Sequence, residues 1–331
     1  MTNRGHRAVL TDQGAPLPVA PPEPGPVAVL PDPRDLHVAA VSDAGGTVGP
    51  LGADTRGIVW LDARDADGLA SALRTAPDVR WVQLPFAGVD AFAHLIAEHG
   101  DRVLFTSAKG AYAEPVAEHA LALTLATLRV LPERARATSW ATEQEGVSLY
   151  GRSVLVVGAG GIALEYLRLL APFEVDVTVV RRSSTPVPGA SRTVTTDHLD
   201  AVLPSADVVM IAAAMTSDTA KLFGPAQFAL MRPTARLVNV ARGGLVDTDA
   251  LVEALRTGQI GGAGVDVTDP EPLPDGHPLW TTPGAVVTPH QADTPEMVAP
   301  LLAERVGANV RAFLSGSGTG FVGVVDPAAG Y

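Results

Sequence analysis

Short apolar runs alternate with amphipathic segments along most of the chain, from about residue 27 to residue 314. The runs are rich in Val, Ile, Leu and Ala, which predicts buried strands, and the amphipathic segments predict helices. Strands that alternate with helices are typical of parallel sheets covered by helices. The predicted strands are 27–30, 57–61, 79–84, 103–106, 154–157, 176–180, 207–212, 236–240, 263–267 and 285–288.

The segments between these strands carry helix signals. Asp65 and Asp247 stand where an N-cap would begin a helix. The predicted helices are 65–75, 89–98, 162–170, 227–231, 250–256 and 295–314. The segment 114–137 is apolar on nearly all sides, which predicts a long helix buried against a partner subunit or a second domain. Residues 1–25 are rich in proline and are expected to form a flexible tail.

Composition narrows the class of protein. A length of 331 residues suits two domains of ordinary size. The net charge of −12 disfavours nucleic acid and anionic membranes as partners. The chain has no cysteine, so disulfides, zinc–thiolate sites and thiol nucleophiles are excluded, and no metal site is predicted. Without a membrane-length apolar run or a signal-peptide core, the protein is expected to be cytoplasmic.

A glycine-rich turn joins the strand Val154–Val157 to the helix predicted from Ile162. Gly158, Gly160 and Gly161 fill this turn, which is typical of the phosphate-binding corner of a dinucleotide fold. The helix N-terminus there offers free N–H groups and a positive dipole end to a pyrophosphate. Glycines also mark turns that bind nothing, so the corner alone leaves both interpretations open.

Three polar residues follow later strands and supply candidate chemistry. Arg242 comes after the strand ending at Val240, Glu271 after the strand ending at Val267, and His290 after 285–288. Ligands of doubly wound sheets bind beyond the carboxyl ends of the strands. Arginine binds a carboxylate with two hydrogen bonds, and histidine exchanges protons near neutral pH. This set suits proton delivery to a carbonyl beside a nicotinamide.

Each of these residues alone is more often structural: a surface ion pair for the arginine, a solvated side chain for the glutamate, a turn residue for the histidine. Their joint occurrence behind a glycine corner favours the catalytic interpretation. His119 and Glu118, on the long apolar helix, are taken as structural, and His277 as a loop residue.

At these residues the sequence resembles the D-isomer-specific 2-hydroxyacid dehydrogenase family, from about Trp81 to Leu314. The matching motifs occur in the family's order. They are Lys109-Gly110-Ala111-Tyr112-Ala113, Val116-Ala117-Glu118-His119, Val238-Asn239-Val240-Ala241-Arg242-Gly243-Gly244-Leu245-Val246-Asp247, Val265-Asp266-Val267, Glu271-Pro272-Leu273-Pro274 and Thr288-Pro289-His290.

The resemblance implies an α/β fold of two parallel-sheet domains, Rossmann-like and flavodoxin-like. The substrate domain would be discontinuous, 26–110 and 293–331, and the dinucleotide-binding domain, 111–292, would be inserted into it. Homodimers built on the helix 114–137 are typical of the family.

The resemblance also implies roles for single residues. Arg242 would bind the substrate carboxylate and polarise the keto group, and His290 would be the acid/base, hydrogen-bonded to Glu271, which favours the protonated ring. The backbone of Phe86, Ala87, Gly88 and Val89 would hold the carboxylate from across a cleft. The cofactor would lie against Gly158, Gly160, Gly161, Ile162, Arg181, Arg182, Ser183, Ala214, Thr219, Val240, Ala241 and Asp266.

The sequence departs from the family pattern at four places. Arg181 stands where NAD users carry an aspartate, at the end of the second strand after the corner, and Arg182 and Ser183 follow it. No carboxylate there would repel a 2′-phosphate, so NADP(H) is predicted over NAD(H), unless the arginines face solvent and either cofactor serves. Ala214 replaces a proline, and Asp293 lies in an altered run after His290. Phe86 stands where a smaller residue is common, and its ring is expected to narrow or line the substrate pocket.

The sequence therefore predicts an oxidoreductase that moves a hydride between a nicotinamide cofactor and C2 of a small 2-keto or D-2-hydroxy acid. Two alternatives stay open. One is a specialised relative, such as a phosphoglycerate or phosphite dehydrogenase. The other is a dinucleotide-sensing regulator without catalysis, like the corepressor relatives of the family. The sequence does not reveal which acid is the substrate, because loop side chains from two domains would shape the substrate pocket.

Overall fold

The computed structural model describes residues 17–140 and 142–327. The chain divides into two compact units. Unit 1 comprises Met1–Ala113 and Thr294–Tyr331, and unit 2 comprises Glu114–Asp293. Unit 2 is thus inserted into unit 1 along the sequence. The boundaries drawn from the sequence were 110/111 and 292/293.

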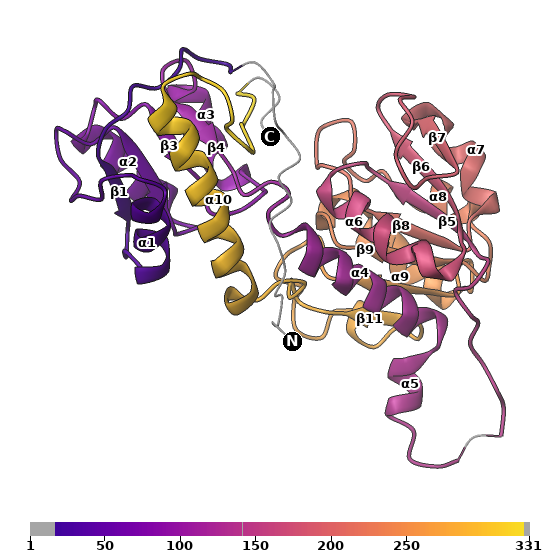
Figure 1. Ribbon diagram of the computed structural model, residues 1–331. Coiled ribbons are helices and arrows are strands. Elements are labelled where there is room, and N and C mark those ends of the chain that lie inside the picture. The colour runs from indigo at the N-terminus through magenta and orange to yellow at the C-terminus, as the bar shows by residue number, and fades with distance from the viewer. Residues whose placement is uncertain (1–16, 141, 328–331) are drawn as a thin grey trace, which may run out of the picture. The chain divides into compact units, whose positions relative to one another are not determined.

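Unit 1 is built on a four-stranded parallel sheet in the order β1-β2-β3-β4 (Figure 1). Asp65 caps α2, as predicted, because its side chain accepts the N–H of Gly68 at 2.8 Å. The strands are β1 (Val27–Leu30), β2 (Gly57–Trp60), β3 (Trp81–Gln83) and β4 (Leu104–Thr106). The helical segments of its described residues are α1 (Asp35–Asp43), α2 (Ala66–Thr75), η1 (Asp90–Phe92), α3 (Ala93–His99) and α10 (Pro295–Ser315).

The last helix, α10, completes unit 1 through buried polar contacts as well as apolar ones. Arg305 is fully buried and donates to the carbonyl oxygens of Ser107 and Lys109, both at 2.8 Å. Asn309 donates to Oε1 of Gln83 at 2.7 Å. Buried charged and amide groups need such partners, so these bonds fix α10 against the segment that follows β4.

Unit 2 is built on a seven-stranded parallel sheet in the order β11-β10-β9-β8-β5-β6-β7. The chain order reverses beside β5, whose neighbours are β6 and β8. Such a reversal is the place where ligands bind in sheets of this kind. The strands are β5 (Ser153–Val157), β6 (Asp176–Arg181), β7 (Arg192–Thr195), β8 (Val208–Ile211), β9 (Arg236–Asn239), β10 (Gly262–Val265) and β11 (Ala285–Val287).

Helices flank this second sheet (Figure 1). The hydroxyl groups of Thr124 and Tyr166, 2.7 Å apart and buried, join α4 to α6. The α-helices are α4 (Ala113–Leu128), α5 (Leu131–Ala135), α6 (Gly161–Leu170), α7 (Leu199–Val202), α8 (Pro225–Leu230) and α9 (Thr248–Arg256). The 3-10 segments are η2 (Ala171–Phe173), η3 (Thr196–His198), η4 (Leu203–Ser205), η5 (Gly243–Leu245) and η6 (Pro278–Trp280).

The two parallel sheets confirm the predicted fold class, but the single helix predicted over 114–137 is wrong in extent. α4 ends at Leu128, whose carbonyl oxygen accepts the N–H of Val147 at 2.9 Å. Val130 then takes a left-handed conformation with φ 51°, and the short helix α5 begins at Leu131. The apolar pattern continues through this break, so the sequence did not reveal it. Figure 1 shows α5 standing away from the sheet of unit 2.

The structure contains two elements that the sequence did not predict, α1 and β7, and it places part of the expected N-terminal tail against unit 1. α1 was not predicted because its apolar face is weak, and β7 was not predicted because Val194 is the only one of its four residues that is apolar and buried. Residues 1–16 of the expected tail lie outside the described residues. Pro21 and Pro24, which belong to the described part, lie beside Gly318 and Gly316 in the C-terminal segment of unit 1.

Candidate active site

The glycine corner lies between β5 and α6, at the point where the strand order reverses. Gly158 has φ +109°, and a Cβ atom built on it would lie 2.5 Å from the carbonyl oxygen of Ala212. Only glycine fits there without strain. A Cβ atom on Gly160 would instead meet no protein atom within 4 Å. The N-terminus of α6 has no side-chain cap, so its N–H groups and the space beside Gly160 fit a dinucleotide pyrophosphate.

The other predicted cofactor residues follow the carboxyl ends of neighbouring strands. Arg181 is the half-buried last residue of β6, and Arg182 and Ser183 are exposed beyond it. Beyond β8, the hydroxyl group of Thr219 donates to the carbonyl oxygen of Ala214 at 2.8 Å. Because all strands of this sheet are parallel, these residues lie at the same edge as the glycine corner. The remaining predicted residues at this edge are Ile162, Val240, Ala241 and Asp266.

Arg242 follows the end of β9 at Asn239, in a loop that the side chain of Asn239 holds. Nδ2 of the fully buried Asn239 donates to the carbonyl oxygen of Arg242 at 3.0 Å, and Oδ1 of Asn239 accepts the N–H of Ala241 at 3.1 Å. The next residue, Gly243, has no room for a side chain, because a Cβ atom would lie 1.9 Å from the carbonyl oxygen of Thr268. The half-exposed guanidinium of Arg242 is therefore held at the edge of the sheet by a tightly packed turn.

His290 and Glu271 form a direct pair. Nδ1 of His290 lies 2.6 Å from Oε1 of Glu271. Since an ionised carboxylate only accepts, Nδ1 carries the proton, and Nε2 is left for another partner. The two side chains are 51% and 42% exposed. His290 has a left-handed backbone with φ 52°, and its N–H donates to the carbonyl oxygen of Asp266 at 2.7 Å.

Asp266 is the buried carboxylate behind this loop, with a side chain only 1% exposed. Its Oδ1 accepts from the Thr288 hydroxyl at 2.6 Å and from the N–H of Gln291 at 2.9 Å, and its Oδ2 accepts from the N–H of Ala292 at 3.1 Å. Burial acts to raise the pKa of Asp266, but hydrogen bonds from His119, Thr288 and Gln291 outweigh it and hold the pKa below its usual value. Asp266 thus remains charged and fixes the His290 loop.

Two further titratable residues face this loop. Nε2 of His119, which the sequence analysis had taken as structural, lies 2.9 Å from Oγ1 of Thr288 and 3.4 Å from Oδ1 of Asp266. The spacing of residues within one motif cannot reveal such a contact, which joins residues 169 positions apart. Burial raises the pKa of Asp293, against the opposing charge of His290. The edge of unit 2 therefore carries more ionisable groups than the predicted triad.

The predicted carboxylate-binding loop belongs to unit 1 and follows β3. Among the described residues, no hydrogen bond uses the N–H groups of Phe86, Ala87, Gly88 or Val89. The ring of Phe86 is 40% exposed and meets the ring of Tyr112 edge-on, with 5.9 Å between centroids. The hydroxyl group of Tyr112 donates to the carbonyl oxygen of Pro85 at 2.5 Å. Tyr112 therefore contacts both the backbone of this loop and the ring of Phe86.

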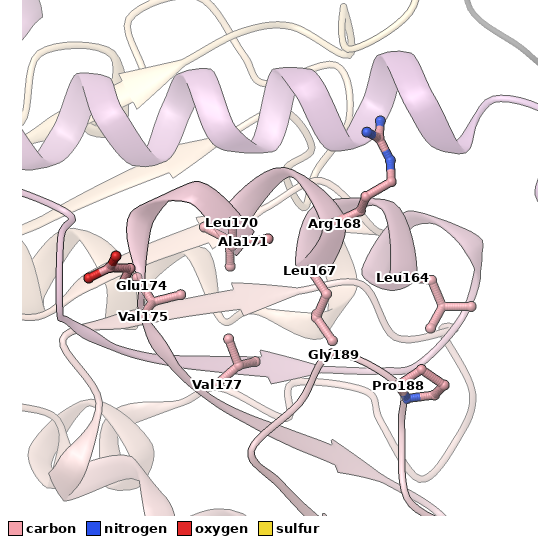
Figure 2. A pocket seen from close by; sticks show the side chains of 10 residues that line it. All are labelled: Leu164, Leu167, Arg168, Leu170, Ala171, Glu174, Val175, Val177, Pro188 and Gly189. Atoms are coloured by element: carbon pink, nitrogen blue, oxygen red, sulfur yellow. The ribbon is translucent and has the colours of Figure 1, made fainter.

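A pocket of about 340 Å³ lies between α6, the start of β6 and the loop that carries Pro188 and Gly189, and Figure 2 shows the side chains that line it. Most of these side chains are apolar, and none belongs to a predicted site residue. It is therefore separate from the candidate active site. Within residues 17–140 and 142–327, no group of acidic residues and histidines could hold a metal ion. Across that same part of the chain, no helix is both long and apolar enough to cross a membrane.

Comparisons with known proteins place the chain in a family. Residues 120–292 match the family described as "D-isomer specific 2-hydroxyacid dehydrogenase, NAD binding domain". The chain therefore belongs to the D-isomer-specific 2-hydroxyacid dehydrogenase family, and unit 2 contains its NAD-binding domain. Members of this class are oxidoreductases that act on CH–OH donors.

Among relatives, the chain is 37% identical over 281 residues to an uncharacterised protein from the proB 3′ region of Corynebacterium melassecola, covering 82% of this chain and 91% of that protein. It is 32% identical over 262 residues to glyoxylate reductase of Thermofilum pendens, covering 75% of each. A solved 2-hydroxyacid dehydrogenase of Xanthobacter autotrophicus Py2, in complex with NADPH and MES, matches with TM-score 0.78 and 26% identity, over 93% of this chain and 100% of that one.

Proposed function

We propose that the protein is an NADPH-preferring reductase of small 2-keto acids, working reversibly as a D-2-hydroxyacid dehydrogenase. The observation that carries this proposal is the His290–Glu271 pair, 2.6 Å apart, at the same strand edge as Arg242 and the glycine corner. A nicotinamide cofactor, when bound, would supply the hydride. The glycyl residues at 158 and 160 and the uncapped start of α6 are the groups that would hold its pyrophosphate.

Three side chains carry out the other steps of the proposed reaction. Arg242 binds the substrate carboxylate with two hydrogen bonds and draws electron density from the neighbouring keto group. Protonated His290 donates its Nε2 proton to the keto oxygen as C2 receives the hydride, and the product is a 2-hydroxy acid. Glu271 orients the ring and stabilises its positive charge. In the reverse direction, neutral His290 takes the hydroxyl proton.

The first test is a panel of 2-keto acids with NADPH, including glyoxylate, hydroxypyruvate and a branched keto acid. Turnover of at least one supports the proposal, and His290→Ala should lower that turnover on the order of 100-fold or more. Near-normal activity of His290→Ala would refute the assignment of the acid/base. Cofactor binding without turnover of any acid would favour a regulatory protein over an enzyme.

The proposed preference for NADPH rests on Arg181 and Arg182 at the end of β6. A 2′-phosphate carries negative charge that guanidinium groups bind well, and this position carries no carboxylate to repel it. The solved relative from Xanthobacter autotrophicus, by its title, contains NADPH. We expect kcat/KM to be higher with NADPH than with NADH, and Arg181→Asp to reverse or abolish the difference. A clear NADH preference of the unaltered enzyme would overturn this part of the proposal.

The unit 1 loop Phe86–Val89 is the proposed second holder of the substrate carboxylate, because its N–H groups have no acceptor among the described residues. We also propose a homodimer formed through α4 and α5. Leu131 at the start of α5 is 50% exposed and Trp140 beyond it is 96% exposed, which leaves large apolar groups to be covered. Sedimentation of the protein at micromolar concentration should give twice the chain mass, and a monomer would refute the dimer.

A further inference from the structure

His119 of α4 contacts the residues that hold the His290 loop, although no step of the proposed reaction uses it. Its Nε2 atom lies 2.9 Å from Oγ1 of Thr288 and 3.4 Å from Oδ1 of Asp266. Oγ1 of Thr288 is in turn 2.6 Å from Oδ1 of Asp266. The His119 side chain is 22% exposed, and that of Asp266 is almost fully buried. Three polar side chains thus meet within hydrogen-bonding distance beneath the loop.

Counting protons fixes the direction of each hydrogen bond. Asp266 is a carboxylate, which only accepts, so the single hydroxyl proton of Thr288 points to its Oδ1. Oγ1 of Thr288 then has only lone pairs left for His119. Nε2 of His119 must therefore carry a proton, and a neutral His119 is the Nε2–H tautomer.

The carboxylate of Asp266 connects this cluster to the catalytic histidine. It accepts the N–H groups of Gln291 and Ala292, and the Asp266 carbonyl oxygen accepts the N–H of His290. His290 has a left-handed backbone with φ 52°, which is unfavourable for an ordinary L-residue, so it persists only where neighbouring hydrogen bonds impose it. A shift of Asp266 would release that constraint and turn the imidazole away from its orientation.

We propose that His119 is a positioning residue of the reductase: by donating Nε2–H to Thr288, it holds Asp266 and the backbone of His290 in the geometry that presents Nε2 of His290 to the substrate. This inference rests on the proposed function, in which His290 is the acid/base. The charged groups that face His119 are Asp266 and Asp293, with His290 beyond them.

The decisive variants differ in whether they keep a donor at position 119. His119→Phe fills the site without a donor and should lower kcat on the order of tenfold, with the KM for NADPH changed by less than about twofold. His119→Gln places an amide N–H in the same region and should recover most of the loss. His94→Phe, at an exposed position on α3, is the matched control and should leave kcat unchanged. Equal loss in the Gln and Phe variants, or no loss in either, would overturn the positioning role.

A double-mutant cycle identifies the partner. Thr288→Val removes both the acceptor of the His119 proton and the donor to Asp266, so its loss of kcat should be at least as large as that of His119→Phe. Because His119 acts through Thr288, the double variant should be little worse than Thr288→Val alone. Additive losses would show that His119 acts through another route. The pH profiles of kcat should keep their shape in His119→Gln and change in His119→Phe, whereas a role in stability alone would move only the melting temperature.

A spectroscopic measurement tests the inference without any turnover. In protein labelled with ¹⁵N-histidine, long-range ¹H–¹⁵N correlations distinguish the two neutral tautomers, and the His119→Gln spectrum assigns the His119 signals. We expect the Nε2–H pattern near neutral pH. An Nδ1–H pattern would refute the inference even in an active enzyme, whereas failure of the unaltered protein with every 2-keto acid would refute the proposed function instead.

Discussion

Oε1 of Glu271 accepts the Nδ1–H of His290 at 2.6 Å, which leaves Nε2 as the ring atom able to reach a substrate oxygen. Both side chains are about half exposed, so the strength of this hydrogen bond comes from its short distance and from the charge of Glu271 rather than from burial. A substitution that removes the charge of Glu271 but keeps a hydrogen-bond acceptor therefore tests what that charge contributes.

Glu271→Gln keeps a hydrogen-bond acceptor for Nδ1 but removes the negative charge. A hydrogen bond to a charged group contributes roughly 1.5–3 kcal/mol, so kcat/KM should fall roughly 10- to 100-fold. Steady-state kinetics of the purified variant measure this fall, with Glu253→Gln, at an exposed position, as the control. An unchanged kcat/KM would show that the charge of Glu271 does not contribute to the reaction.

Replacing glycine by alanine should have different effects at two positions of the glycine corner, Gly158 and Gly160. Gly160→Ala places a methyl group where no protein atom lies within 4 Å, so the folded apo protein should keep its melting temperature. The same methyl group would intrude where the pyrophosphate is expected, so the KM for NADPH should rise on the order of tenfold or more. Gly158→Ala, which has φ +109° and meets the Ala212 carbonyl oxygen, should instead lower the melting temperature. Unaltered cofactor affinity in Gly160→Ala would place the pyrophosphate elsewhere.

Buried His37 on α1 predicts how stability depends on pH. Neither of its ring nitrogens has a hydrogen-bond partner among the described residues, and burial, together with Arg34, lowers its pKa below 6.5. The folded state therefore binds fewer protons than the unfolded state once the pH falls below about 6.5. The free energy of unfolding should be constant with respect to this group above that pH and should decrease as the pH falls towards the folded-state pKa.

Urea unfolding at pH 7.5, 6.5 and 5.5 tests this dependence. His37→Leu removes the titrating group and should lose less stability than the unaltered protein as the pH is lowered. His94→Leu, at an exposed position, should retain the full decrease. If His37→Leu and the unaltered protein show parallel decreases, His37 takes up its proton equally in both states.

Phe86 predicts which keto acids are preferred. Its exposed ring, braced by Tyr112, offers an apolar contact in the loop proposed to hold the substrate. Phe86→Ser should lower kcat/KM for a branched keto acid relative to glyoxylate on the order of tenfold, since apolar contact with such a side chain is lost. Phe86→Tyr keeps the ring and should keep the ratio. A ratio unaffected by Phe86→Ser would separate this side chain from substrate choice.

Much of this arrangement could be predicted because it depends on local patterns. Apolar runs gave nearly all the strands, and strand ends in a parallel sheet share an edge, so Arg242, Glu271 and His290 were expected together. The hydrogen bond between His290 and Glu271 was implied by the resemblance to the family. Its observed geometry agrees with the prediction, while the roles of these residues in catalysis remain predictions for the experiments above.

The residues that sequence reasoning missed depend on tertiary packing. His119 lies on α4, whose apolar pattern predicts a buried helix. That pattern does not predict the contact of His119 with Thr288, which depends on how α4 packs in unit 2. The break after Leu128 was hidden for a similar reason, because the hydrogen bond from Val147 that ends α4 comes from a returning loop. Burial of His37 depends on α1, whose weak apolar face gave no helix signal.

The insertion of unit 2 also sets the order in which a newly made chain can be completed. The hydrogen bond from Asn309 to Gln83 joins positions 226 residues apart, so this contact with the sheet of unit 1 can form only after α10 has been synthesised. Unit 2 is continuous from Glu114 to Asp293 and can close before that helix is synthesised. During this interval the first four strands lack the contacts that α10 makes with them and with the segment after β4.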